Sequence, residues 1–266
     1  MHIRAWAGAL AALLFFATPA SAQTALDWWA GATFGYERFE ADAGGDADGA
    51  FYGVEAAASF PVSGHWGGQV EARVVNHETE DNNSVVGVAA LHAFHRTDRA
   101  LVGAVIAYSG AEDVHAWAFG LEGELYGEAH TVGAQAMVWS IDDLDAELVD
   151  VNAHYRHFFT PELMAELRAG WGDVQVDLPG AEDADYWTLA AALEHQRGNL
   201  SYGGRVFYVD ADGGSAAGVG FVLRWNGDAQ RSLRDRDRTG PSLRVESDLL
   251  ALGYTSASYD PYIPPT

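Results

Sequence analysis

The stretch FYGVEAAASFPVSGHWGGQVEARVV, residues 51–75, is the part of the sequence that decides the fold. It predicts two β-strands joined by a tight turn at residues 62–65. In the second strand, Gln69, Glu71 and Arg73 alternate with Gly68, Val70, Ala72 and Val74. Because successive side chains of a strand point to opposite faces, one face is polar or very small and the other apolar. This distribution is typical of a strand with lipid on one side and a polar lumen on the other.

The N-terminus predicts an export signal. Residues 1–4 carry one positive charge, residues 5–16 are apolar, and Ala20-Ser21-Ala22 matches an A-x-A cleavage site. The apolar stretch is too short to span a bilayer comfortably as a helix. We therefore expect residues 1–22 to be a cleaved signal peptide, and no later apolar run is long enough for a transmembrane helix.

Composition excludes several classes of function. The formal net charge is −23, which disfavours nucleic acid as a partner because phosphate contacts need basic surface. The sequence has no cysteine, so an exported chain must rely on packing and hydrogen bonds rather than disulfides. No motif indicates a cofactor.

The pattern of residues 51–75 recurs along the chain, and twelve strands are predicted in all. Their expected ranges are 30–39, the two strands of residues 51–75, 85–94, 101–108, 114–125, 130–139, 146–158, 163–172, 186–196, 200–209 and a last strand that ends at Trp225. Period-two alternation is clear in most of them, for example in Glu122 and Glu124 beside Leu121. The strands at 85–94 and 101–108 are apolar on both faces, and His92 is left unassigned.

The connections between these strands alternate in character. Short turns join every second pair, and more acidic connections join the others. An even strand count with short turns on one side and longer loops on the other is the layout of outer-membrane barrels. Residues 30–225 therefore resemble a Gram-negative outer-membrane β-barrel of porin type, at the level of architecture and without a family-specific motif. The resemblance implies an all-β, antiparallel up-and-down transmembrane barrel in the cell outer membrane.

Aromatic residues cluster near both ends of the predicted strands. Near the short turns are Trp29, Phe60, Trp66, Phe94, Phe158, Tyr202 and Trp225; nearer the loops are Tyr36, Tyr52, Trp117, Trp139, Trp171, Trp187 and Tyr208. Two such belts are expected where amphipathic rings lie at headgroup depth. A soluble β-sandwich would bury its large aromatics in mid-strand instead, so the distribution favours the barrel.

The polar face of the strands is the first candidate functional site. Fifteen residues are expected to face the lumen: Glu55, Gln69, Glu71, Arg73, Glu122, Glu124, Gln135, Asn152, His154, Arg156, Glu166, Arg168, Glu194, Arg205 and Arg224. Eight-stranded barrels are filled by side chains, whereas sixteen strands leave an aqueous channel. Twelve strands leave two alternatives open, a narrow pore or a packed network of paired charges.

Residues beyond Trp225 break the pattern. We divide the chain into the signal peptide, a barrel at residues 23–227 and a C-terminal tail at residues 228–266. Prolines near the C-terminus exclude an interior strand there. The stretch 243–254 has three alternatives, an added strand, a segment inside the lumen or a periplasmic tail, and we favour the last. The aromatic end of the final strand, Trp225, is the expected signal for the barrel-assembly machinery.

The loops carry the second candidate site. Acidic residues gather in the longer connections, and none of those loops contains Arg or Lys. Such a mouth concentrates cations, and oxygen-rich clusters attract Ca²⁺ or Mg²⁺. No loop has an ordered metal-ligand spacing, so we expect a cation preference without a specific metal site.

The sequence thus predicts a porin-like channel for passive diffusion of small solutes or ions, surrounded by outer-membrane lipid and lipopolysaccharide. Alternatives are a non-conducting structural or adhesive barrel and, less favoured, a lipid hydrolase, an autotransporter pore or a secreted sandwich. His157 and His195 are the candidates for a hydrolase, but no serine has a defensible place beside them. We therefore do not expect an enzyme.

Overall fold

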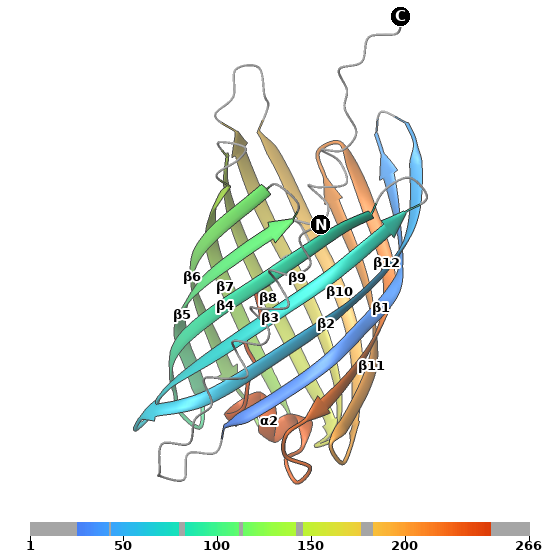
Figure 1. Cartoon of the computed structure of the whole chain (residues 1–266). Coiled ribbons are helices and arrows are strands. Elements are labelled where there is room, and N and C mark those ends of the chain that lie inside the picture. Colours follow the sequence, from blue (N-terminus) through green and yellow to red (C-terminus); the bar gives the residue numbers. More distant parts are fainter. Residues whose placement is uncertain are drawn as a thin grey trace, which may run out of the picture.

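The computed structural model describes residues 26–42, 44–79, 83–111, 114–141, 146–176 and 183–245. In this part of the chain twelve antiparallel strands form a closed barrel (Figure 1), which confirms the predicted fold class and strand number. The strands are β1 (Asp27–Ala41), β2 (Asp46–Ser63), β3 (Trp66–Thr79), β4 (Asn83–Arg96), β5 (Ala100–Ala111), β6 (Val114–Tyr126), β7 (His130–Ile141), β8 (Ala146–Thr160), β9 (Leu163–Val176), β10 (Ala184–Arg197), β11 (Leu200–Ala211) and β12 (Gly214–Asn226).

Every strand pairs with its neighbours in sequence, and β1 pairs with β12 to close the barrel. Ala30 lies opposite Trp225 in that closing pair, and Ala41 lies opposite Gly214 at its other end. Closure leaves no unpaired edge, which removes the exposed backbone groups that a membrane could not satisfy.

Several strands are longer than the sequence predicts. The acidic, glycine-rich residues 40–49, which lie between two of the predicted strands, are mostly strand, because the β1–β2 ladder continues as far as the pair Glu40 and Asp46. In the same way, β9 continues through Val176, beyond residue 172, where the predicted strand ends. Backbone pairing in the ladder therefore extends beyond the apolar residues from which the strands were predicted.

The outer face of the barrel is apolar and exposed. On β6, for example, Phe119 is 64% exposed and Leu121 is 70% exposed, and Val102, Leu167 and Phe221 on other strands are also exposed. Because large apolar side chains cover the outside and polar ones are turned inward, the usual arrangement of a soluble protein is reversed. A lipid-facing wall has this arrangement.

The aromatic residues expected in two belts divide between the two faces. Exposed members are Phe60, Trp66, Tyr202 and Trp225 near the short turns, and Tyr36, Tyr52, Trp117, Trp171, Trp187 and Tyr208 nearer the loops. Trp29, Phe94, Phe158 and Trp139 are buried instead, which corrects their assignment to the belts. The prediction used their position near the strand ends but not the face of the strand to which alternation assigns them. Phe94 lies two residues from buried His92, and Phe158 lies two residues from buried Arg156, so both side chains point into the barrel.

After β12 the chain turns back to the barrel. Helix α2 (Leu233–Thr239) lies at the end of the barrel where the short turns are (Figure 1), and residues 240–245 follow it. We call residues 231–245 the inner tail. Within the described residues, no helix has the length and apolar character needed to cross a membrane.

Candidate functional site: the lumen and the inner tail

The fifteen residues expected in the lumen are all shielded from solvent. Ten of them are buried, and Arg73, His154, Glu166, Arg168 and Arg205 are half-buried. On several strands they alternate with exposed apolar residues, as Glu122 does with Leu121, whereas on β3 the alternating residues are buried or half-buried. The structure thus places them in the interior of the barrel, where six of them take part in two charge clusters.

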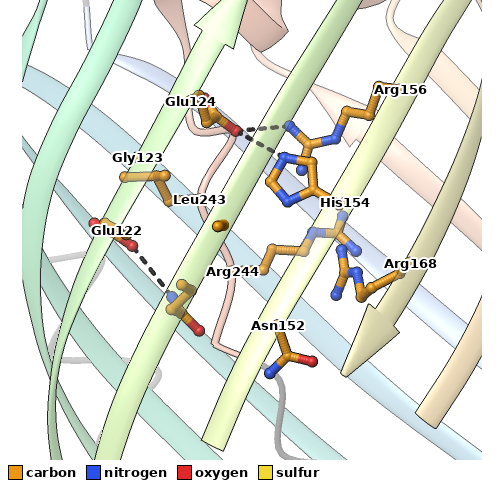
Figure 2. A pocket seen from close by; sticks show the side chains of 11 residues that line it. Glu122, Gly123, Glu124, Asn152, His154, Arg156, Arg168, Leu243 and Arg244 are labelled. Atoms are coloured by element: carbon orange, nitrogen blue, oxygen red, sulfur yellow. Dashed lines mark hydrogen bonds and ion pairs between the residues drawn. The ribbon is translucent and has the colours of Figure 1, made fainter. Parts of the chain in front are cut away.

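The first cluster surrounds Arg156 on β8 (Figure 2). Its guanidinium donates to Glu124 on β6 at 2.9 Å and to Glu166 on β9 at 2.6 Å. It also donates to the Asp237 carboxylate at 2.7 Å and to the Ser242 carbonyl at 3.1 Å, both in the inner tail. Since Arg156 is buried, these bonds supply the partners that an ion needs away from water.

The second cluster surrounds Arg224 on β12. This residue pairs with Glu55 on β2 at 2.9 Å and with Glu194 on β10. Its guanidinium also lies over the ring of Trp29, 4.8 Å from the centroid. The guanidinium of Arg244, from the inner tail, lies 5.1 Å from the centroid of the same ring. The buried Trp29 therefore brings two arginines together, which a position in an aromatic belt would not allow.

His92 on β4 is an interior residue that the sequence did not assign. It is fully buried, and its Nδ1 lies 3.0 Å from the carboxylate of Glu122. Its Nε2 lies 3.8 Å from Glu71 on the other side. The neighbours of His92 on β4 are apolar on both faces, so alternation within that strand gave no signal. The register with Gln69 on β3, whose inward direction was predicted, would have supplied one.

The inner tail is bonded to the interior of β3. The side chain of Gln69 donates to the Leu243 carbonyl at 2.6 Å and accepts from the Leu243 backbone N–H at 3.3 Å. Glu71 accepts from the backbone N–H of Val245 at 2.6 Å. These bonds satisfy backbone groups that would otherwise be buried without partners. The described tail residues therefore lie inside the barrel rather than in the periplasmic position that we favoured; residues 246–266 are outside the described part.

The apolar inner faces of β4 and β5 are explained by the same segment. Val245 packs in an apolar cluster with Val88 and Val105, and Leu243 packs with Phe94 and Leu101. Burial of these side chains removes apolar surface from a lumen that would otherwise hold water. One apolar face of these two strands therefore belongs to the outer surface of the barrel, and the other packs against the inner tail.

Helix α2 is held to the short-turn end of the barrel. Ser232 caps its first turn by accepting from the Asp235 backbone N–H at 3.1 Å, and the Asp235 side chain completes a capping box. Arg238 donates to the carbonyls of Gly127 and Glu128 in the β6–β7 turn. Arg231, just before the helix, pairs with Asp27 at 2.9 Å. Contacts on several sides thus fix the helix across this end.

A cavity of about 160 Å³ remains beside the inner tail. Its charged lining comprises Glu55, Arg73, Arg156, Glu166, Arg168, Glu194, Arg205, Arg224, Arg236, Asp237 and Arg244. Seven arginines and four acidic residues leave an excess of three positive charges in this lining. The inner tail thus occupies one side of the lumen and leaves a basic space on the other.

The remaining predicted features lie outside the lumen. Many of the loop acids fall on residues that the structure does not describe, and the described residues contain no group of His, Asp and Glu that could hold a metal ion. His157 lies 3.5 Å from the Tyr155 hydroxyl, and the ring of His195 packs against Tyr202. The ring of His157 also packs edge-on against Phe159, with 4.8 Å between the ring centroids.

Comparisons with known proteins agree on the fold. No protein-family model matches the sequence, and a search of curated proteins also finds no match. Among solved structures, the chain is similar to the KdgM porin in complex with disordered oligogalacturonate, with a TM-score of 0.51 and 8% identity over 73% of this chain and 98% of that one. It is also similar to the translocator domain of the autotransporter NalP from Neisseria meningitidis, with a TM-score of 0.52 and 10% identity over 84% of this chain and 96% of that one. At these identities the likeness concerns the architecture: the chain has the fold of outer-membrane β-barrels of porin type.

Proposed function

We propose that the protein is an outer-membrane channel for passive diffusion of small solutes or ions. The observation that carries the proposal is a closed barrel with an apolar outer face, a charged interior and a cavity within that interior. The proposal includes export by a cleaved signal peptide, insertion by the barrel-assembly machinery and a final place among outer-membrane lipid and lipopolysaccharide.

The inner tail restricts this channel. It occupies the side of the lumen next to β3, β4 and β5, and helix α2 lies across the short-turn end. A solute would have to pass beside the tail through the basic cavity, or the tail would have to leave. We therefore expect a small conductance for the full-length protein.

Planar-bilayer recording of the purified, folded protein tests the proposal. We expect discrete steps of small conductance in a simple salt solution, because the cavity is narrow and lined with charge. A correctly folded barrel that gives no ion conductance would contradict the channel and favour a structural or adhesive role.

The charge preference has two opposing sources. We propose that the acidic loops concentrate cations at the mouth of the barrel. We also propose that these loops bind divalent cations weakly. The cavity lining has the opposite sign. A reversal potential measured in a salt gradient distinguishes them: a cation-selective value supports the mouth as the dominant element, and an anion-selective value removes the cation preference.

A non-conducting structural barrel is the second candidate. The specific observation in its favour is the number of interior charges already paired, such as Arg156 with three carboxylates and Arg224 with two. A network of this kind fills space and holds the tail in place. The bilayer recording above separates the two candidates.

A further inference from the structure

The backbone of residues 240–243 is bonded to the barrel wall at every residue. The four carbonyls of this segment accept hydrogen bonds from wall side chains on four different strands. The donors are, in chain order of the acceptors, Arg96 on β4 at 3.0 Å, Trp29 on β1 at 3.2 Å, Arg156 on β8 at 3.1 Å and Gln69 on β3 at 2.6 Å. The wall therefore contacts four successive carbonyls, a group that every peptide carries.

The backbone N–H groups of Leu243 and Val245 are bonded to β3. Gln69 accepts from the Leu243 N–H at 3.3 Å while it donates to the carbonyl of the same residue. One side-chain amide thus pairs with both backbone groups of a residue, as a residue on a neighbouring strand can. Glu71, two residues further along the same face of β3, accepts from the Val245 N–H at 2.6 Å. Because a step of two residues on β3 matches a step of two in the tail, the tail lies along β3 as an extended segment.

The side chains of this segment alternate between two parts of the wall. Leu243 and Val245 pack against apolar residues of β4 and β5. Arg244, between them, extends toward Arg168 on β9 (Figure 2), and its guanidinium lies against the ring of Trp29 on β1. Where proteins bind extended peptides, main-chain hydrogen bonds provide affinity and pockets for alternate side chains provide selectivity. The wall around the inner tail offers both.

We propose that this part of the wall is a binding site for short extended peptides, and that the inner tail is the peptide that occupies it in the full-length protein. A site that contacts mainly backbone groups accepts peptides of differing sequence, because those groups are common to all of them. The apolar contacts of Leu243 and Val245 favour peptides with apolar residues two positions apart. The inference rests on the proposed channel, for which it names short peptides as a class of solute.

A peptide-binding measurement on a cut barrel tests the inference. The full chain is folded first and is then cut at a protease site inserted after Ala229, which is exposed between β12 and α2. Urea is added until the cut tail leaves while the barrel keeps the gel mobility of the folded state, and the urea is then removed. In neutral detergent, a fluorescent, amidated peptide of residues 231–245 should bind to this emptied barrel, as measured by fluorescence anisotropy. The capped tetrapeptide of residues 242–245 should compete with it, and maltotriose should not.

Methylated peptides test whether the backbone is what the wall recognises. N-methylation at Val245 removes the donor to Glu71 and keeps every side chain, so it should weaken binding of the 231–245 peptide roughly tenfold or more. N-methylation at Arg244 is the matched control, because among the described residues no hydrogen bond of the Arg244 backbone N–H is found. This control peptide should bind much like the parent peptide.

A pair of glutamine variants tests the same site from the side of the barrel. Gln69→Met removes the side chain that bonds both backbone groups of Leu243, so the emptied barrel should bind the parent peptide more weakly. Gln135→Met is the matched control, because the Gln135 side chain donates to Glu122 on the wall and not to the tail. The folded state of each variant is verified by the heat-dependent shift in its gel mobility.

Three results would overturn the inference. They are an emptied, folded barrel that does not bind the parent peptide, equal binding of the two methylated peptides, and a tail that leaves only when the barrel itself unfolds. In the last case the segment is part of the core rather than the occupant of a site. Because binding is measured without a membrane, a barrel that conducts but binds no peptide loses this inference and keeps the channel. One that binds the peptide but never conducts loses the channel.

Discussion

Arg156 links the barrel wall to the inner tail. Its guanidinium contacts carboxylates on β6, β9 and α2, together with a backbone carbonyl of the tail. A buried ion held by this many bonds is costly to disturb, because any partner left alone must stay charged away from water. Arg156 is therefore the residue where the fold of the barrel and the position of the tail depend on each other.

Replacement of Arg156 by Met should destabilise the protein markedly. The change leaves Glu124, Glu166 and Asp237 buried without their shared cation, and loss of one member of a buried ion pair costs about 3–5 kcal/mol. The free energy of unfolding, from urea titration of the barrel in lipid vesicles, measures the effect.

Arg38→Met is the control for this substitution. Arg38 also pairs with two carboxylates, Glu40 and Asp46, but its side chain is half exposed to solvent. Exposed pairs contribute little, so this variant should unfold close to the wild type. If both substitutions lower the free energy of unfolding by the same amount, the buried bonds of Arg156 stabilise the protein no more than the exposed pairs of Arg38.

Residue positions were predictable where alternation was strict. Glu122 and Arg156 alternate with large apolar residues, so their inward direction follows from the alternation of side chains between the two faces of a strand. His92 and Trp29 gave no such signal, because an inward histidine and an inward tryptophan depend on partners from distant parts of the sequence. For His92 these are Glu122 and Glu71, and for Trp29 they are Arg224 and Arg244.

At the scale of elements, the inner tail is the feature that the sequence analysis placed least well. Its charged residues and Pro241 argue against a strand, but they do not say on which side of the barrel end the segment lies. The information was in β4 and β5: strands without a polar face imply an apolar occupant of the lumen. Val88 and Val105 on these strands contact that occupant through Val245.

Removal of the tail should open the lumen. A chain that ends after Gly227 keeps all twelve strands and loses α2, Leu243 and Val245. We expect its single-channel conductance in planar bilayers to rise roughly severalfold, since an unfilled twelve-stranded barrel is wider than the side-chain-filled eight-stranded ones.

A chain that ends after Val245 is the control for this truncation, because it retains every tail contact described above. It should conduct much like the full-length protein. Equal conductance in the chain ending after Gly227 and the chain ending after Val245 would mean that the inner tail does not limit the current.

At the scale of the whole molecule, the architecture was predictable and its contents were not. Strand number, pairing order and closure follow from alternation that recurs in most of the strands and from short turns between every second pair. Whether the lumen is open depends on side chains meeting across the barrel, such as Arg224 with Glu55, 169 residues apart in sequence. Local patterns carry no such long-range information.

The membrane environment of the outer face makes a final prediction. Leu121 in the middle of β6 and Val62 beside the β2–β3 turn are exposed to a similar extent, 70% and 66%. If lipid covers the barrel, arginine at the bilayer midplane costs about 2–4 kcal/mol, whereas near the interface it costs about 0–1 kcal/mol. Leu121→Arg should therefore lower the free energy of unfolding from lipid vesicles by that larger amount, and Val62→Arg should change it little.

In water both positions would tolerate arginine equally, because both side chains already lie on the surface. The same two variants compared by urea titration thus report what surrounds the barrel, and equal stabilities in vesicles would contradict a membrane-spanning wall.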